Sequence, residues 1–77
     1  MNKKFAVIGL GVFGSAIARK LAERGADVMA IDENEERVQE LAQEVAFAVT
    51  LDATNLQALE AQTLRDVDAV VVSIGSS

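Results

Sequence analysis

Four short apolar runs, separated by segments with helical spacing, constrain the fold of this chain more than any other feature of its sequence. The first run covers residues 5–8 and is stopped by glycine, which is typical of a strand buried on both faces of a parallel sheet. Further strands are predicted over residues 27–32, 46–51 and 68–74, the last ending at Gly75. Because strands joined by helical crossovers run parallel, the sequence predicts an α/β fold with one parallel sheet.

The first helix is predicted to begin at Phe13 and to end before Gly25, since glycine is favoured just beyond a helix C-terminus. Large apolar residues recur every four positions along it, at Phe13, Ile17 and Leu21. This spacing indicates an amphipathic helix with these side chains on its apolar face.

Two more helices complete the pattern. One is predicted over about residues 34–44, where the apolar residues follow the i, i+3, i+4, i+7 rule: Val38, Leu41, Ala42 and Val45. The other begins at Thr54, which can form a capping box with Gln57. The element order is therefore βαβαβαβ, and right-handed connections predict half of a Rossmann fold with strand order 3-2-1-4.

Size and residue types exclude several classes of protein. With 77 residues there is room for one domain, and we assign residues 1–77 to a single truncated Rossmann-like domain. The absence of cysteine and histidine excludes a disulfide-stapled mini-protein and the usual zinc modules. The longest apolar runs are far shorter than the roughly 18 residues of a membrane span, so a soluble, cytoplasmic protein is expected.

The charge balance opposes binding to nucleic acid. Twelve acidic and seven basic residues give a net charge of −5, and no cluster of Lys and Arg offsets it. Because like charges repel, a phosphate backbone is an unfavourable partner.

Gly9, Gly11 and Gly14 form a G-x-G-x-x-G motif between the first strand and the first helix. Gly9 permits the tight turn, Gly11 lets a pyrophosphate approach the backbone, and Gly14 lets the helix pack closely on the sheet. The helix N-terminus would then offer amide N–H groups and the positive end of its dipole to phosphates. The alternative is that the glycines serve only the turn.

Asp32 ends the second strand, at the spacing of about 20 residues that the dinucleotide fingerprint requires. A carboxylate there can accept hydrogen bonds from both ribose hydroxyls, and its alternative role is a solvated cap near the second helix. The carboxylates of Glu33, Glu35 and Glu36 would repel a 2′-phosphate, which disfavours NADP. Arg37 is predicted to be a surface ion-pair partner on this acidic helix.

The ends of the third and fourth strands share the sheet edge with Asp32, where ligands of open α/β sheets bind. Further candidate contacts to the nucleotide are therefore Asp52, Ala53, Thr54, Ser73 and Gly75. Structural roles also account for them, because a turn and a helix cap explain Thr54 and a glycine at a strand end is ordinary.

Neither catalysis nor a metal site is indicated. The chain has no His, Cys or Tyr to act as acid, base or nucleophile. Its carboxylates are accounted for by ribose binding, helix starts and surface charge, so no enzymatic activity is expected.

Several segments together resemble the N-terminal nucleotide-binding lobe of RCK domains, also called KTN or TrkA-N domains, which regulate potassium transport. They are the run Phe-Ala-Val-Ile-Gly-Leu-Gly-x-Phe-Gly from Phe5, the acidic end of the second strand, Leu-Asp-Ala-Thr at 51–54, Leu59, and Asp-Ala-Val-Val-Val-Ser-Ile-Gly at 68–75. The likeness covers nearly the whole chain, and the Asp-Ala-Thr segment with the valine-rich strand separates it from ordinary dehydrogenases.

The resemblance implies a regulatory module that binds NAD(H), ADP or ATP and forms dimers or rings on the cytosolic side of a Trk- or Ktr-type potassium transporter. It implies phosphate contacts at the glycine motif, which includes Val12 and Phe13, and a ribose contact at Asp32. The adenine side would be formed by Asp52, Ala53 and Thr54.

Two departures from the family pattern affect these expectations. Some ATP-responsive members carry Arg at the position of Val12, so a triphosphate is less favoured here than NAD(H), ADP or AMP. The family's lobe also continues with further helices and strands, so this chain is expected to be a fragment or an engineered half. Its fourth strand would then be an apolar edge, which predicts a homodimer or an exchange of elements between copies.

Two other functions fit the sequence. One is the cofactor half of an NAD-dependent dehydrogenase, which would not need the Asp-Ala-Thr segment at residues 52–54. The other is a minimal half-Rossmann domain made to test whether such a piece folds, without retained binding.

Overall fold

The computed structural model describes residues 2–51 and 66–73 of the chain. The elements, in order, are β1 (Lys4–Ile8), α1 (Val12–Glu23), β2 (Asp27–Asp32), α2 (Glu35–Leu41), β3 (Phe47–Thr50) and β4 (Ala69–Val72). Each corresponds to a predicted element, with bounds that agree for β2 and are shorter than predicted for α2, β3 and β4. The predicted third helix and the last residue predicted for the fourth strand, Ile74, lie outside the described residues.

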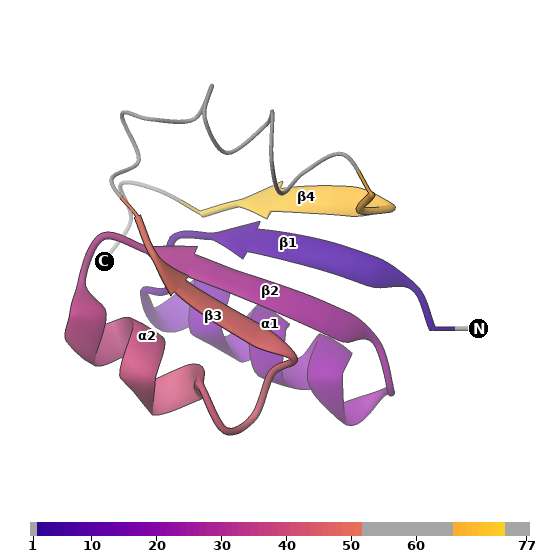
Figure 1. The fold of residues 1–77 in the computed structure, drawn as a ribbon, viewed down its shortest axis with the longest axis horizontal. Coiled ribbons are helices and arrows are strands. Elements are labelled where there is room, and N and C mark those ends of the chain that lie inside the picture. The colour runs from indigo at the N-terminus through magenta and orange to yellow at the C-terminus, as the bar shows by residue number, and fades with distance from the viewer. Residues whose placement is uncertain (1, 52–65, 74–77) are drawn as a thin grey trace.

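The four strands form one parallel sheet in the order β3-β2-β1-β4 (Figure 1), which confirms the predicted topology. Ile8 pairs with Ile31 on one side and with Val72 on the other, so the carboxyl ends of these strands meet at one edge. The chain moves from β1 outward to β3 and then returns to the other side of β1. This reversal creates a switch point between β1 and β4, the place where open α/β sheets bind ligands.

Helices α1 and α2 lie on the same face of the sheet (Figure 1), as right-handed crossovers in one direction require. The core on that face consists of buried residues from both helices, the central strands and the connections after β1 and α2: Val7, Leu10, Ala18, Val28, Ala30, Val38, Leu41 and Val45. A second cluster on Ile8 and Ile31 lies among Met29, Val49 and Leu51. Ala6, Val7 and Ile8 are at most 2% exposed, so β1 is buried on both faces as predicted.

The packing face of α1 differs from the predicted one. Its buried residues are Gly14 and Ala18, whereas Phe13 is 64% exposed and Ile17 is 37% exposed. The predicted apolar face of Phe13, Ile17 and Leu21 was therefore wrong for Phe13 and Ile17, whereas Leu21 packs against the core as predicted. At Gly14 the helix approaches the sheet so closely that a small residue is required at the contact. Ala42, predicted on the apolar face of α2, is also exposed.

Gly14 is the residue that permits this close approach. A Cβ built on its backbone would overlap the carbonyl oxygen of Gly9, in the turn that follows β1. The first turn of α1 therefore rests directly on the backbone of the turn, as the sequence predicted for the third glycine of the motif.

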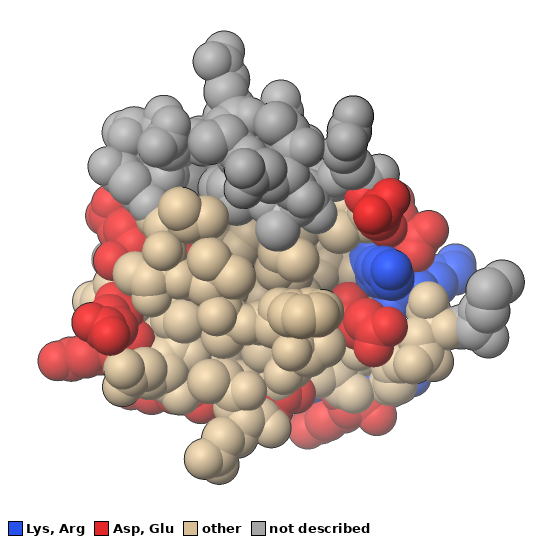
Figure 2. Space-filling model, viewed as in Figure 1, with Lys and Arg blue, Asp and Glu red and all other residues tan. Residues whose placement is uncertain are grey.

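Charged side chains gather mainly around the rim of the face shown in Figure 2, where the centre is largely uncharged. Carboxylates lie at several places on that rim, and the basic side chains visible in this view gather at its right. In the described residues, no helix is long and apolar enough to cross a membrane.

Replacement of Gly14 tests the packing of α1. Helix propensity alone would make Gly14→Ala stabilising by about 1 kcal/mol. The overlap with the Gly9 backbone leads us to expect the opposite sign, a loss of about 2–3 kcal/mol in the free energy of unfolding. Urea denaturation followed by circular dichroism measures the difference. The exposed Ala16→Gly calibrates the propensity of the same helix, and a more stable Gly14→Ala would contradict the close approach.

Candidate functional site

The turn between β1 and α1 is built to bring backbone N–H groups to the carboxyl edge of the sheet. Gly9 has a φ of 94°, a left-handed conformation that favours glycine, and its N–H donates a 2.8 Å hydrogen bond to the carbonyl oxygen of Ile31. Gly11 is the N-cap of α1, and its backbone is extended. Within the described residues, no side chain caps this helix and its first turn carries no acidic residue. The amides and the positive dipole end of α1 are therefore open to an anion.

Asp32 is the buried carboxylate of this edge. It ends β2 and is 8% exposed. Its Oδ2 accepts a 2.6 Å hydrogen bond from the N–H of Leu10, and its Oδ1 accepts one of 2.8 Å from the N–H of Asn34. One side chain thus holds together the glycine turn, the end of β2 and the start of α2. Each carboxylate oxygen offers two acceptor positions, and the hydrogen bonds within the described residues use one on each.

The surroundings of Asp32 differ from the solvated cap considered as its alternative role. The carboxylate is buried, and the cap of α2 is Asn34, whose Oδ1 accepts a 2.9 Å hydrogen bond from the N–H of Glu36. Sequence reasoning missed this role of Asn34 and the anchoring N–H of Leu10. Asn directly before a helical segment is a recognised N-cap signal, whereas nothing in the identity of Leu10 indicates its backbone contact.

Arg37 lies beside the same carboxylate. Its Nη1 is 3.9 Å from Oδ2 of Asp32, and its side chain is 48% exposed. The sequence predicted a surface ion pair with acidic neighbours on the helix. The carboxylate that the structure places beside it instead is the buried one at the end of β2.

The predicted site residues in the described part converge on one edge. Gly9, Gly11, Gly14 and Asp32 are linked through the turn, and the N–H of Ser73 donates a 2.8 Å hydrogen bond to the carbonyl oxygen of Ile8. The Cβ of Ser73 is 3.4 Å from a Cβ built at Gly14, which brings the end of β4 against the start of α1.

The remaining predicted contacts divide into two groups. Val12 and Phe13 stand at the start of α1 with exposures of 70% and 64%, so their side chains are accessible next to the glycine turn. Asp52, Ala53, Thr54 and Gly75 lie outside the described residues. In residues 2–51 and 66–73, no three side chains of Asp, Glu, His or Cys gather to hold a metal ion.

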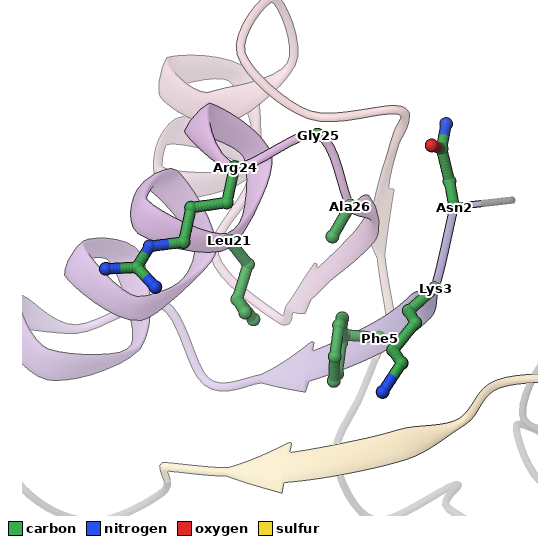
Figure 3. A pocket seen from close by; sticks show the side chains of 7 residues that line it. All are labelled: Asn2, Lys3, Phe5, Leu21, Arg24, Gly25 and Ala26. Atoms are coloured by element: carbon green, nitrogen blue, oxygen red, sulfur yellow. The ribbon is translucent and has the colours of Figure 1, made fainter.

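A hollow of about 330 Å³ lies at the opposite, amino-terminal edge of the sheet (Figure 3). Phe5, Leu21 and Ala26 form its apolar part, and Arg24 is also among the residues that line it. Because the glycine turn and Asp32 are at the carboxyl edge, this hollow is not part of the candidate site.

Comparison with known protein families gives one match over nearly the whole chain. Residues 5–77 match the family described as the TrkA-N domain. The matched segment includes the glycine motif, Asp32 and every other residue predicted to contact a nucleotide.

Two similar proteins belong to potassium uptake systems. The Ktr system potassium uptake protein C of Bacillus subtilis (strain 168) is 46% identical over 77 residues, which cover 100% of this chain and 35% of that protein. The Ktr system potassium uptake protein A of Vibrio alginolyticus is 41% identical over 75 residues, which cover 97% of this chain and 34% of that protein. The chain thus spans about a third of the length of these relatives.

One similar protein is an enzyme. The UDP-N-acetyl-D-mannosamine dehydrogenase of Methanocaldococcus jannaschii is 44% identical over 50 residues, which cover 65% of this chain and 12% of that protein. This match is shorter than those to the two potassium uptake proteins.

Removal of the Asp32 carboxylate tests its structural role. In Asp32→Ala, the N–H of Leu10, a residue 3% exposed, loses its acceptor. We expect the free energy of unfolding to fall by about 2–3 kcal/mol, and by less in Asp32→Asn, which keeps one oxygen. Urea denaturation measures both variants. Glu40→Ala, which removes an exposed carboxylate from α2, is the control and should change stability by less than about 0.5 kcal/mol; equal losses in all three variants would contradict the anchoring role.

Proposed function

The chain belongs to the TrkA-N domain family, and on that premise we propose that it is a regulatory nucleotide-binding module of a Ktr- or Trk-type potassium uptake system. Its ligand is an adenine nucleotide, NAD(H) or ADP/ATP, bound at the carboxyl edge of the sheet. Binding there changes the arrangement of the module and, through it, the activity of a membrane transporter subunit.

The observation that carries this proposal is the position of the Asp32 carboxylate. It is fixed by the N–H groups of Leu10 and Asn34, and the hydrogen bonds within the described residues use one of the two acceptor positions on each oxygen. Two adjacent acceptors on a rigid carboxylate match the adjacent 2′- and 3′-hydroxyls of a ribose. Because the carboxylate is already oriented, a ligand loses little free energy in ordering it.

The start of α1 supplies the complementary part for phosphate. Its first amides lack a side-chain cap in the described structure, and Gly11 has no Cβ to keep a phosphate away from the backbone. Asp32 is bonded to the residue between Gly9 and Gly11, so the ribose and phosphate positions are joined through a single turn. This arrangement supports a ribose 5′-phosphate as the part of the ligand that is held most firmly.

The groups at the carboxyl edge of the sheet indicate which part of a nucleotide is bound. A dinucleotide spans the switch point between two halves of a Rossmann sheet, whereas the described strands supply one half. The adenosine phosphate of NAD(H), ADP or AMP therefore makes the main contacts. The exposed Val12, at the position where some ATP-responsive members carry Arg, offers no charge to a third phosphate.

We propose no enzymatic role for the chain. The similar dehydrogenase makes the cofactor half of such an enzyme the second candidate, but its match covers 65% of this chain, whereas the two Ktr proteins named above match 97% or more of it. In the proposed role the module works on the cytoplasmic side of the membrane, and its macromolecular partner is the transporter subunit. Its net charge of −5 disfavours nucleic acid.

A second copy of the chain is part of the proposal. Strand β4 is the outer strand next to β1, and Val70 and Val72 on it are 41% and 60% exposed. An apolar outer strand favours pairing with another chain, so we propose a homodimer or a higher oligomer.

Nucleotide binding is tested by titrating the folded chain with ADP, ATP, NAD and NADH, using calorimetry and amide chemical shifts. We expect shifts at the glycine turn and weaker binding by about 10- to 100-fold in Asp32→Asn, because hydrogen bonds to a charged group are lost. Glu40→Gln, which neutralises an exposed carboxylate on α2, should bind as the wild type does. A folded wild-type chain that gives neither heat nor shifts with any of the four nucleotides would refute the proposal.

Oligomeric state is tested by analytical ultracentrifugation at micromolar concentration. We expect the mass of a dimer or larger species for the wild type, and a shift toward monomer for Val72→Lys, which places a charge on the apolar outer strand. Ala16→Lys, on the exposed side of α1, should leave the mass unchanged. A monomeric wild-type chain would count against the proposed homodimer.

A further inference from the structure

The proposed function does not explain the position of Arg37 beside Asp32. Its Nη1 lies 3.9 Å from Oδ2 of Asp32, close enough for electrostatic attraction but beyond hydrogen-bond distance. The guanidinium therefore lies beside the carboxylate without a hydrogen bond from Nη1 to Oδ2. Its 48% exposure leaves one side open to solvent, and hence to a ligand.

The direction of the Arg37 side chain is informative, because α2 itself offers another partner. Glu40 follows Arg37 by three residues on this helix, a spacing that allows an ion pair. Among the described residues, however, the carboxylate found within 4 Å of its guanidinium is that of Asp32. The cation is thus turned toward the ligand edge.

The covalent structure of a nucleoside indicates which part of the ligand would lie beside Arg37. The base is attached to C1′ of the ribose, next to the carbon that carries the 2′-hydroxyl. If Asp32 accepts hydrogen bonds from the ribose hydroxyls, the base leaves the sugar immediately beside this carboxylate. A guanidinium 3.9 Å from the same carboxylate is then within reach of the base.

We infer that Arg37 recognises the base of the bound nucleotide, with its planar guanidinium stacked on the purine ring. The inference rests on the proposed function, because it takes the ribose position from Asp32. A planar, weakly hydrated cation is attracted to the face of an aromatic ring, and a purine offers a larger face than a pyrimidine. Arg37 thus makes the site selective for purine nucleotides.

Recognition of a 2′-phosphate is the other role that a cation here could have. The charges around it oppose that role, since a phosphate would stand beside the buried Asp32 and near the exposed carboxylates of Glu33, Glu35 and Glu36. One guanidinium already beside a carboxylate compensates for little of this repulsion. An uncharged aromatic ring meets no such opposition.

The test compares the dissociation constants of ADP and CDP, measured by amide chemical-shift titration of the 77-residue chain. In Arg37→Ala we expect the constant for ADP to rise about 3- to 30-fold, with less than about a 2-fold change for CDP, so that the preference for ADP is largely lost. Arg37→Lys keeps the charge without the planar group and should leave the preference low. Arg19→Ala, which removes an exposed arginine paired with Glu44 at 3.0 Å, should retain it.

Several outcomes would overturn the inference, and they separate it from the proposed function. If the wild type binds ADP and Arg37→Ala keeps the preference for ADP over CDP, the role of Arg37 is refuted while nucleotide binding stands. Full recovery of the preference by Arg37→Lys would assign the effect to charge and refute stacking. Adenosine 2′,5′-bisphosphate binding more tightly than AMP, with a gain that Arg37→Ala abolishes, would make Arg37 a 2′-phosphate contact. A folded wild type that binds no nucleotide would refute both proposals.

Discussion

The hydrogen bond from the Leu10 N–H to the Asp32 carboxylate is the interaction on which the site depends. At 2.6 Å it joins the glycine turn after β1 to the end of β2, and the second oxygen of the same carboxylate joins that strand to the start of α2. A hydrogen bond that involves a charged acceptor in a buried position is strong, and removal of the acceptor would leave a buried N–H without a partner. Asp32 therefore has a structural role whether or not a nucleotide is bound.

Asp32 thus combines a structural role with its proposed role as a ribose contact. An acidic residue at the end of the second strand is commonly read as a ribose ligand, and the second acceptor position on each Asp32 oxygen agrees with that reading. Its two backbone bonds also preorganise the turn that would hold the phosphate. Loss of Asp32 would thus weaken binding by two routes, directly through the ribose and indirectly through the turn, and stability must be measured alongside affinity to tell them apart.

The helix α1 shows where sequence reasoning failed. Its spacing predicts a helix after the glycine motif, which the structure confirms, and an apolar face formed by Phe13, Ile17 and Leu21. The structure buries Gly14 and Ala18 and leaves Phe13 exposed, because the start of α1 lies too close to the sheet for a large side chain to fit between them, and only further along the helix does Leu21 pack against the core. A periodic pattern shows which residues share a face of a helix. The distance between helix and sheet decides which of those faces can pack against the sheet.

The sequence by itself determined the elements and their order. Apolar runs that end at glycine or aspartate, and crossovers of helical length, leave a parallel sheet in the order found, since right-handed connections exclude most other arrangements. It also placed the glycines and Asp32 at one edge, because strand ends in a parallel sheet coincide. Only the tertiary structure decided that Asp32 is anchored by the backbone of Leu10 and that Arg37 turns toward it. These contacts depend on the backbone positions and side-chain directions of residues in different elements. Local residue patterns do not specify such positions or directions.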